Sequence, residues 1–412
     1  MRSRSAFETL KSWRTALTAV LLGLAGGAAA LDWTGRVSVL GGVSIPARGD
    51  AGAAAAHVPG ADQQGLRLMA QDRGDSSEWS LHLDAARSSQ RGLVGAAPQA
   101  SDLFRWRRLA DEQLGGDGIE RSTRIGWAID RAVFKRRFGQ ATLALGRQPV
   151  DFGSGRFWQP LNVFGAFAPT DLDTDYKAGI DAAVLDIYPS ASSSLTAVVA
   201  LAPRHQPEIE DSAALHYRRQ VGDTSQLVLL AARVVGQRQV GAAFESDWRG
   251  IGWRVEGLHT RPEGGGAGSL FWIVGGDYQF DNGTLLALEW HDDARGATHE
   301  ATLAEVATRR PVVQGLQQQL ARRVFGLSVQ RDLTPLLNAS YTLLASRLRA
   351  ADGQHAVSLL QQLSLVRSLS NESDLLLSLA SGSGRGLDAA GAPRSSFGHL
   401  PLTATLRWRR YF

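Results

Sequence analysis

The sequence of 412 residues contains no cysteine, only three lysines and no long uninterrupted apolar run. The lack of cysteine excludes the disulfide framework on which exported domains without a large core commonly depend. Because no segment after the N-terminal region approaches about 18 consecutive apolar residues, a helical membrane protein is also excluded. Because the chain has only three lysines, nearly every basic side chain is an arginine, whose guanidinium fork fits carboxylate and phosphate groups.

The first 30 residues have the pattern of an export signal. Four basic residues precede a short apolar core at 16–24, and three alanines follow at 28–30. We therefore expect residues 1–30 to be a cleaved signal peptide and residues 31–412 to form the exported protein. The leader holds four of the 44 basic residues and one of the 40 acidic residues, so the remainder is close to neutral. We expect no nucleic acid partner.

The last twelve residues, Pro401 to Phe412, indicate one β-strand that ends on an aromatic residue. Their apolar side chains share one parity and most polar side chains share the other, which predicts a lipid-facing side and a lumen-facing side. Arg410 stands on the lipid parity, where a long side chain can snorkel to the headgroups. The chain-end Phe resembles the terminal signal by which the barrel-assembly machinery recognises Gram-negative outer-membrane barrels. The apolar set is Leu402, Ala404, Leu406, Trp408 and Phe412.

Short alternating segments, separated in turn by tight and long connections, run through the whole chain. Glycine-rich composition, with 45 of 412 residues, suits such strands and turns. They predict an all-β, transmembrane, antiparallel up-and-down β-barrel of about 18 strands, with 16 as the other possible count. A soluble β-protein with the same parity pattern is the alternative. The expected strands are 33–43, 62–72, 76–87, 120–131, 135–148, 178–188, 192–202, 212–221, 224–235, 239–247, 250–261, 269–280, 284–293, 322–331, 335–348, 354–366, 372–381 and 400–412.

The order of the connections predicts how the barrel is oriented. Tight turns and both termini fall on one side, the periplasm, and the long connections become extracellular loops. The lumen parity is polar and mixed in sign, so its charges either select solutes or pair across strands. The basic members are Arg36, Arg67, Arg124, Arg254, Arg407 and Arg409, and the acidic members are Asp84, Asp130, Glu245, Asp247, Glu256, Asp277 and Glu289.

The segment from Gly146 to Ala182 is the most distinctive part of the chain. It contains GRQ at 146–148, FGSG at 152–155, WQP at 158–160, PTDLD at 169–173 and GIDA at 179–182. This order resembles Gram-negative outer-membrane channel families, porin-like and alginate-export-like, without assigning a subfamily. In those families GRQ ends a strand, a glycine-aromatic-proline loop follows, and a D-x-D stretch leads into G-x-D-A.

The loop at 149–177 is too aromatic to remain in water, so we expect it to be buried. It either folds into the barrel mouth and constricts the pore, or caps the outer rim, or contacts a neighbouring subunit. The candidate pore or constriction residues combine this loop with charged lumen positions. They are Arg147, Asp151, Arg156, Trp158, Asp171, Asp173, Asp175, Lys177, Arg124, Asp130, Arg254, Glu256, Arg407 and Arg409.

Catalysis is the least favoured class of function. His82 with Asp84, and His291-Asp292-Asp293, are the candidate catalytic groups, but no serine nucleophile motif stands beside them and no H-E-x-x-H motif is present. The absence of C-x-x-C-H excludes covalent haem, and we expect no cofactor or metal.

The resemblance and the pore pattern together imply a porin-like channel in the outer membrane. We expect it to pass small hydrophilic, possibly anionic solutes by passive or facilitated diffusion. The alternatives are an export pore for a polysaccharide and a structural barrel around a periplasmic partner. The expected partners are outer-membrane lipid, lipopolysaccharide and the assembly machinery through Phe412, and the sequence leaves the oligomeric state open.

Overall fold

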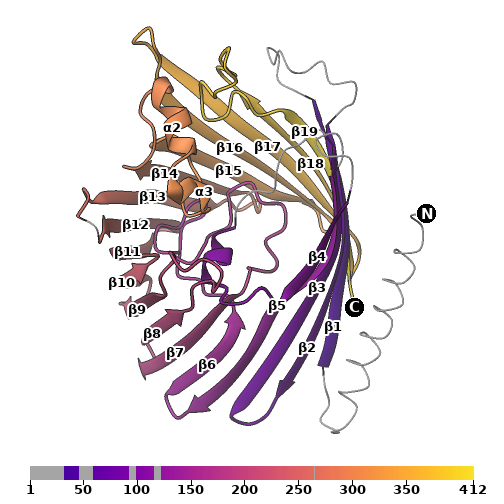
Figure 1. The fold of residues 1–412 in the computed structure, drawn as a ribbon, viewed down its shortest axis with the longest axis vertical. Coiled ribbons are helices and arrows are strands. Elements are labelled where there is room, and N and C mark those ends of the chain that lie inside the picture. The colour runs from indigo at the N-terminus through magenta and orange to yellow at the C-terminus, as the bar shows by residue number, and fades with distance from the viewer. Residues whose placement is uncertain (1–31, 46–58, 92–98, 116–121, 264) are drawn as a thin grey trace.

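The wall of the protein is a closed antiparallel β-barrel (Figure 1). The computed structural model describes residues 32–45, 59–91, 99–115, 122–263 and 265–412. In these residues, 18 wall strands pair in chain order, and the wall closes where β1 (Asp32–Ile45) pairs with β19 (Leu402–Tyr411). The all-β barrel of about 18 strands is therefore confirmed. The expected signal peptide, residues 1–30, lies outside the described residues.

All 18 expected strands have a counterpart in the wall, with most ends within three residues of the expected ones. Tight turns at one end of the barrel alternate with mostly longer connections at the other, as the sequence predicted. The other wall strands are β2 (Gly60–Arg73), β3 (Ser77–Arg91), β5 (Ser122–Phe138), β6 (Ala141–Gln148), β7 (Ile180–Ser190), β8 (Ser193–Ala200), β9 (Ser212–Val221), β10 (Ser225–Val234), β11 (Gln237–Trp248), β12 (Ile251–Pro262), β13 (Ser269–Gln279), β14 (Leu285–Asp293), β15 (Arg323–Thr334), β16 (Leu337–Arg349), β17 (His355–Ser370) and β18 (Ser373–Ser383).

The boundary expected between 131 and 135 is wrong, because β5 continues to Phe138 and turns at Gly139, whose φ is +58°. A β-bulge explains the error. The pairing of β3 with β5 shifts register between His82 and Leu83, which leaves Asp130 as an extra residue. The exposed side chains change from odd positions such as Ile125 to even positions such as Phe134 across it. This change of parity inside one strand mimics the end of a strand.

The connection between β3 and β5 contains two elements that the sequence did not predict. The first, η1 (Ala100–Phe104), packs against the inner side of the wall. The second, β4 (Ala110–Gly115), pairs with residues 123–128 of β5. There β4 adds a short nineteenth strand to the sheet. The connection between β14 and β15 adds η2 (Glu300–Thr302), α2 (Leu303–Ala307) and α3 (Arg310–Val313).

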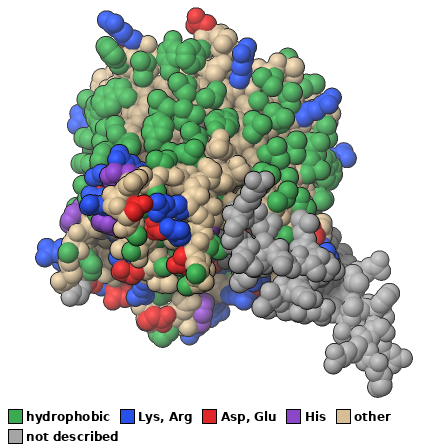
Figure 2. Space-filling view, turned by 90° about the horizontal axis from the view of Figure 1, so that it is seen from above, with side chains coloured by type: hydrophobic (Ala, Val, Ile, Leu, Met, Phe, Trp, Pro, Cys, Tyr) green, Lys and Arg blue, Asp and Glu red, His purple; other side chains and the backbone are tan. Residues whose placement is uncertain are grey.

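The two faces of the wall differ in polarity. Large apolar side chains such as Val39, Leu145 and Leu229 are exposed on the outside. Figure 2 shows them as a broad band with charged side chains gathered along its edges. The positions between them face inward and include buried arginines and carboxylates such as Arg67 and Glu256. This is the alternation of a barrel that spans a membrane.

The connections fold into the barrel and form its hydrophobic core. One core cluster packs Phe104 of η1 and Phe164 of the 149–179 connection against Val198 and neighbouring inward residues of β7–β10. A second cluster packs Trp158 against Leu344 and other inward residues of β13–β16, together with α2. Burial of this apolar surface stabilises the 149–179 connection inside the barrel.

Candidate functional site

The 149–179 connection, which we call the lumen loop, crosses the inside of the barrel from β6 to the opposite wall and returns to β7. Its first half contacts β12 and β14, and its second half contacts β1 and β19. Figure 1 shows it in the space that the strands enclose. A loop held at opposite walls divides the lumen.

Two glutamates hold the first half of the lumen loop. Glu289 on β14 is 1% exposed and accepts backbone N–H groups from Arg156, Phe157 and Trp158 at 2.9, 3.2 and 2.8 Å. Glu256 on β12 is fully buried. It accepts the backbone N–H and the hydroxyl of Ser154 and the backbone N–H of Leu161. Hydrogen bonds to carboxylates are about twice as strong as neutral ones, so these contacts fix the path of the loop.

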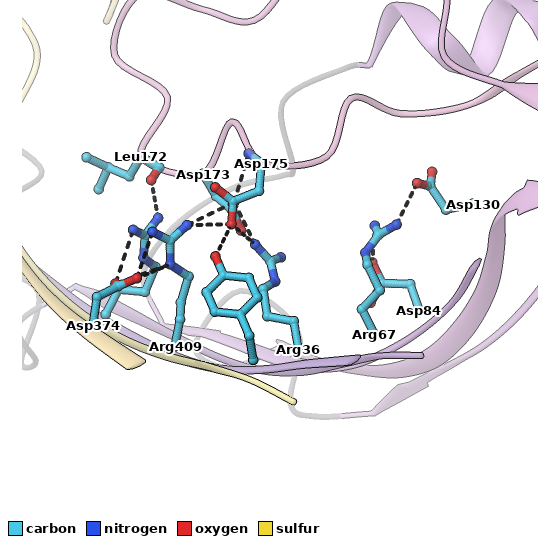
Figure 3. Close-up of polar contacts among 11 residues, drawn as sticks. Arg36, Arg67, Asp84, Asp130, Leu172, Asp173, Asp175, Asp374 and Arg409 are labelled. Atoms are coloured by element: carbon cyan, nitrogen blue, oxygen red, sulfur yellow. Dashed lines mark hydrogen bonds and ion pairs between the residues drawn. The ribbon is translucent and has the colours of Figure 1, made fainter. Parts of the chain in front are cut away.

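Arginines from β1 and β19 hold the second half of the lumen loop (Figure 3). Arg36 donates to Asp173 and Asp175, both at 2.8 Å. Arg409 and Tyr411 also donate to Asp175, at 2.6 and 2.5 Å. Burial opposes the ionisation of Asp175, but the Tyr411 hydrogen bond and the two arginines outweigh it and lower the pKa of this carboxyl. Asp175 is therefore ionised at neutral pH.

A second group of charges surrounds the end of the loop. Arg67 on β2 bridges Asp84 and Asp130, both at 2.9 Å. The ring of Tyr176 lies 4.5 Å from the Arg67 guanidinium and 4.9 Å from that of Arg36. These cation–π contacts join the two groups through one loop residue.

The start and end of the loop are also fixed by ion pairs. Arg147 is 3% exposed, pairs with Asp181 at 2.7 Å and donates to two backbone carbonyls. Lys177 lies between Asp151 at 3.0 Å and the side-chain oxygen of Asn162 at 2.8 Å. Burial lowers the pKa of Lys177, and Asp151 partly compensates.

Two polar cavities lie on either side of the lumen loop. One, of about 470 Å³, is lined by Lys135 and Arg218 on the short-turn side and by Asp151 of the loop. The other, of about 450 Å³, is lined by Arg124 on the long-connection side and by Tyr176 of the loop. The loop thus separates two spaces that each admit a small molecule.

The structure brings most of the fourteen candidate residues together around the loop. Asp171, Asp173, Asp175 and Lys177 lie on its second half. Burial raises the pKa of Asp171, and its hydrogen bond from the backbone of Ala168 opposes this. Arg407 donates to the Leu172 carbonyl, whereas Arg124 stands apart, with Glu112 3.7 Å away.

Several candidates are anchors rather than exposed lining. Arg147, Trp158, Glu256 and Arg407 are each at most 3% exposed, and Arg254 and Asp130 are below 9%. Arg254 pairs with Asp277, which also pairs with Arg156 of the loop. Trp158 packs on Phe157 and His291, so its ring is not presented to the lumen. On the loop, the side chains of Asp151 and Arg156 are 58% and 49% exposed.

The residues of this site that were missed include Tyr176, Asp374 and Arg105. Tyr176 and Asp374 lie outside any motif, and Arg105 follows η1, which was not predicted. Asp374 pairs with Arg409 at 2.9 Å, and Arg105 pairs with Asp130 at 3.1 Å. Only the β18–β19 register, in which Asp374 faces Arg409, offered a signal for one of them.

The histidines considered for catalysis do not pair with the expected carboxylates. Asp84 pairs with Arg67, while Nδ1 of His82 has no hydrogen-bond partner among the described residues. Asp292 pairs with Arg322 and Arg323, and His291 contacts the Arg322 carbonyl at 3.2 Å.

No helix in the part of the chain that the structure describes is long and apolar enough to cross a membrane.

A closed wall of 18 strands, apolar outside, with a loop held across a polar lumen, is the fold of an outer-membrane porin. Solved structures with this fold include OccAB4 of Acinetobacter baumannii, at 9% identity and a TM-score of 0.60 over 93% of this chain and 98% of that one. A BenF-like porin from Pseudomonas fluorescens Pf-5 has 9% identity and a TM-score of 0.58, with 93% and 98% covered.

Pseudomonas aeruginosa OccK2 (OpdF), solved in complex with glucuronate, has 11% identity and a TM-score of 0.55, with 93% of this chain and 96% of that one covered. The comparison with protein-family models finds no match, and neither does the comparison with curated proteins. The likeness to these solved structures confirms the expected outer-membrane barrel at the level of the fold.

Proposed function

We propose that this chain is an outer-membrane channel that passes small hydrophilic solutes by passive or facilitated diffusion and prefers anions. The observation that carries the proposal is the lumen loop, which is held at opposite walls and leaves a polar cavity of about 450–470 Å³ on each side. Spaces of this size suit a small solute, whereas a polysaccharide would require the loop to move. Selection then depends on pore width and charge.

The preference for anions is supported by the basic side chains that line the two cavities. Arg67, Arg105, Arg108 and Arg124 line one cavity, and Lys135 and Arg218 line the other. Guanidinium groups suit a carboxylate, and glucuronate, bound to OccK2, is a carboxylate. Within the loop, the exposed Asp151 and Arg156 are proposed to meet the solute, while Arg147, Trp158 and Glu256 hold the loop in position.

The chain end supports the proposed recognition by the barrel-assembly machinery. Phe412 is 59% exposed, and its backbone exchanges two hydrogen bonds with Gly35 across the closure of the barrel. The aromatic ring is therefore displayed beside the seam between β1 and β19.

The first experiment is the conductance of the refolded barrel, residues 31–412, in a planar bilayer. We expect discrete steps and, under a salt gradient, a reversal potential of the sign that marks anion preference. The basic side chains that line the two cavities are the reason for this expectation. A folded barrel without steps would refute the channel, and a cation-selective potential would refute the anion preference alone.

Replacement of Asp175 by Asn is expected to increase anion selectivity. The substitution removes one negative charge from between Arg36 and Arg409, so that each arginine keeps one close carboxylate, Asp173 for Arg36 and Asp374 for Arg409. The Asp171→Asn variant is the matched control, because it removes a carboxylate of the same loop whose one hydrogen bond within the described residues comes from the Ala168 backbone N–H. The reversal potential under a salt gradient checks both. Equal shifts in the two variants would contradict a special role for Asp175.

The pH dependence of the wild-type channel follows from the same carboxyl. Since its pKa is lowered, the contacts of ionised Asp175 are present above the ordinary value of about 3.9 and are lost only as the pH falls through the lower folded value. We therefore expect the contribution of Asp175 to selectivity to persist from pH 7 to about pH 4. The difference in reversal potential between wild type and Asp175→Asn, recorded across this range, should stay constant; a difference that vanishes near pH 6 would contradict the assignment.

A further inference from the structure

The long-connection ends of β15 and β16 carry an excess of positive charge. Arg322, Arg323, Arg347 and Arg349 form what we call the rim arginine cluster. Arg322 and Arg323 share one carboxylate, Asp292, through their Nε atoms at 2.8 and 3.0 Å. Arg347 and Arg349 are exposed and have no ion pair among the described residues.

Three other carboxylates of this end of the barrel are bound to different arginines. Asp293 pairs with Arg295 at 2.6 Å. Glu300 pairs with Arg385 and Arg394, and Asp352, in the turn that follows β16, also pairs with Arg385. Asp292 is therefore the one carboxylate paired with the cluster in the described part of the chain, so four arginines face one acidic group.

The alternation of burial directs three of the four arginines toward the outside of the barrel. Ser346 and Leu348 on β16 are each 2% exposed and face inward, so Arg347 and Arg349 face outward. Val357, the cross-strand neighbour of Arg347, is 56% exposed on the same face. Arg323 also faces outward, since Val324 beside it is 1% exposed.

The cluster lies at the edge of the apolar band. Arg347 lies ten positions after Leu337, which stands at the short-turn end of β16, and this is a path of about 34 Å along the strand. With a strand tilt of about 35–45°, this corresponds to a height of about 25 Å, the height of the lipid-facing band of such barrels. The outward positions between them are Ala339, Tyr341, Leu343 and Ala345. The guanidinium groups therefore lie at the level of lipid headgroups.

Asp292 offsets only part of the positive charge of this cluster. Arg323 lies one position beyond the pair Val324↔Ser346 and therefore opposite Arg347. Like charges opposite each other on neighbouring strands destabilise the sheet. A phosphate group removes this repulsion and accepts parallel hydrogen bonds from a guanidinium fork. A solute in transit does not meet this surface, because the surface faces away from the lumen.

We propose that the rim arginine cluster binds the phosphate groups of lipopolysaccharide in the outer leaflet. The inference rests on the proposed placement of the barrel in the outer membrane, with its long connections outside. It assigns to Arg323, Arg347 and Arg349 a role in contact with lipid that is separate from passage through the lumen.

The test measures binding of fluorescent lipid A that carries its phosphates to the whole barrel in neutral detergent micelles. The triple variant Arg323→Ala, Arg347→Ala, Arg349→Ala is expected to bind at least about tenfold more weakly than wild type, because each arginine near an anionic lipid surface contributes about 1 kcal/mol. Dephosphorylated lipid A is expected to bind wild type as weakly as the triple variant binds the phosphorylated form.

The matched control is Arg331→Ala. Arg331 is exposed on the outward face of β15, the strand that begins at Arg323, but it lies near the short-turn end of that strand. Its replacement should therefore leave lipid A binding unchanged. Equal binding by wild type and the triple variant, or an equal loss in Arg331→Ala, would overturn the proposal. The conductance of the triple variant in neutral phospholipid should match wild type. A silent wild-type barrel would reject the channel without affecting the lipid result, so the two failures are distinguishable.

Discussion

Removal of residues 152–168 from the lumen loop is expected to raise the single-channel conductance at least about twofold, because an 18-strand barrel leaves an aqueous channel when nothing fills it. The deleted segment contains the residues held by Glu256 and Glu289 and the aromatic side chains that fill the lumen, among them Trp158 and Phe164. Ion selectivity should fall at the same time, since the solute would no longer pass the charged groups of this segment.

The matched control for this deletion is removal of residues 389–391, an exposed tip of the connection between β18 and β19. It shortens the chain at the same end of the barrel but removes no residue of the lumen loop, so its conductance should equal that of wild type. Both variants are compared in planar bilayers after their folding is verified by the resistance of the barrel to unfolding in detergent. An unchanged conductance in a folded 152–168 variant would show that this segment does not narrow the pore.

The wall of the barrel could be predicted from sequence because it depends on a local rule. Alternation of apolar and polar residues within each strand is visible one strand at a time, and turn residues mark the ends. The rule fails at Asp130, where a bulge reverses the parity inside β5. It also fails for β4, since this short strand is defined by its pairing with β5 and shows no apolar alternation of its own.

The site depends on contacts between distant parts of the chain, and this limits what the sequence shows. Composition predicted that the aromatic lumen loop is buried, and parity placed Glu256 and Glu289 in the lumen. Neither observation indicates that these two carboxylates accept backbone N–H groups more than 90 residues away in the sequence. The position of Tyr176 between Arg36 and Arg67 likewise requires the path of the whole loop.

Replacement of Glu289 by Ala is expected to release the first half of the lumen loop. The substitution leaves three backbone N–H groups, those of Arg156, Phe157 and Trp158, without their acceptor in the interior. Each buried unsatisfied group costs about 1–3 kcal/mol, so local opening should become easier by at least about 3 kcal/mol. The open fraction of the loop should then rise about hundredfold, since about 1.4 kcal/mol corresponds to a factor of ten.

Trypsin reports this opening, because Arg156 lies in the released segment and cleavage of a briefly open state follows its population when closing is fast. We expect the fragment that ends at Arg156, measured by mass spectrometry, to form about a hundred times faster in Glu289→Ala than in wild type. Glu245→Ala is the control. Glu245 is a carboxylate of β11 that accepts a hydrogen bond from Gln226 at 3.1 Å, and within the described residues no hydrogen bond or ion pair joins it to the loop. Because Gln retains one acceptor oxygen but no charge, Glu289→Gln should give an intermediate rate. Equal rates in wild type and Glu289→Ala would mean that the hydrophobic packing of Phe157 and Trp158 holds the loop without the carboxylate.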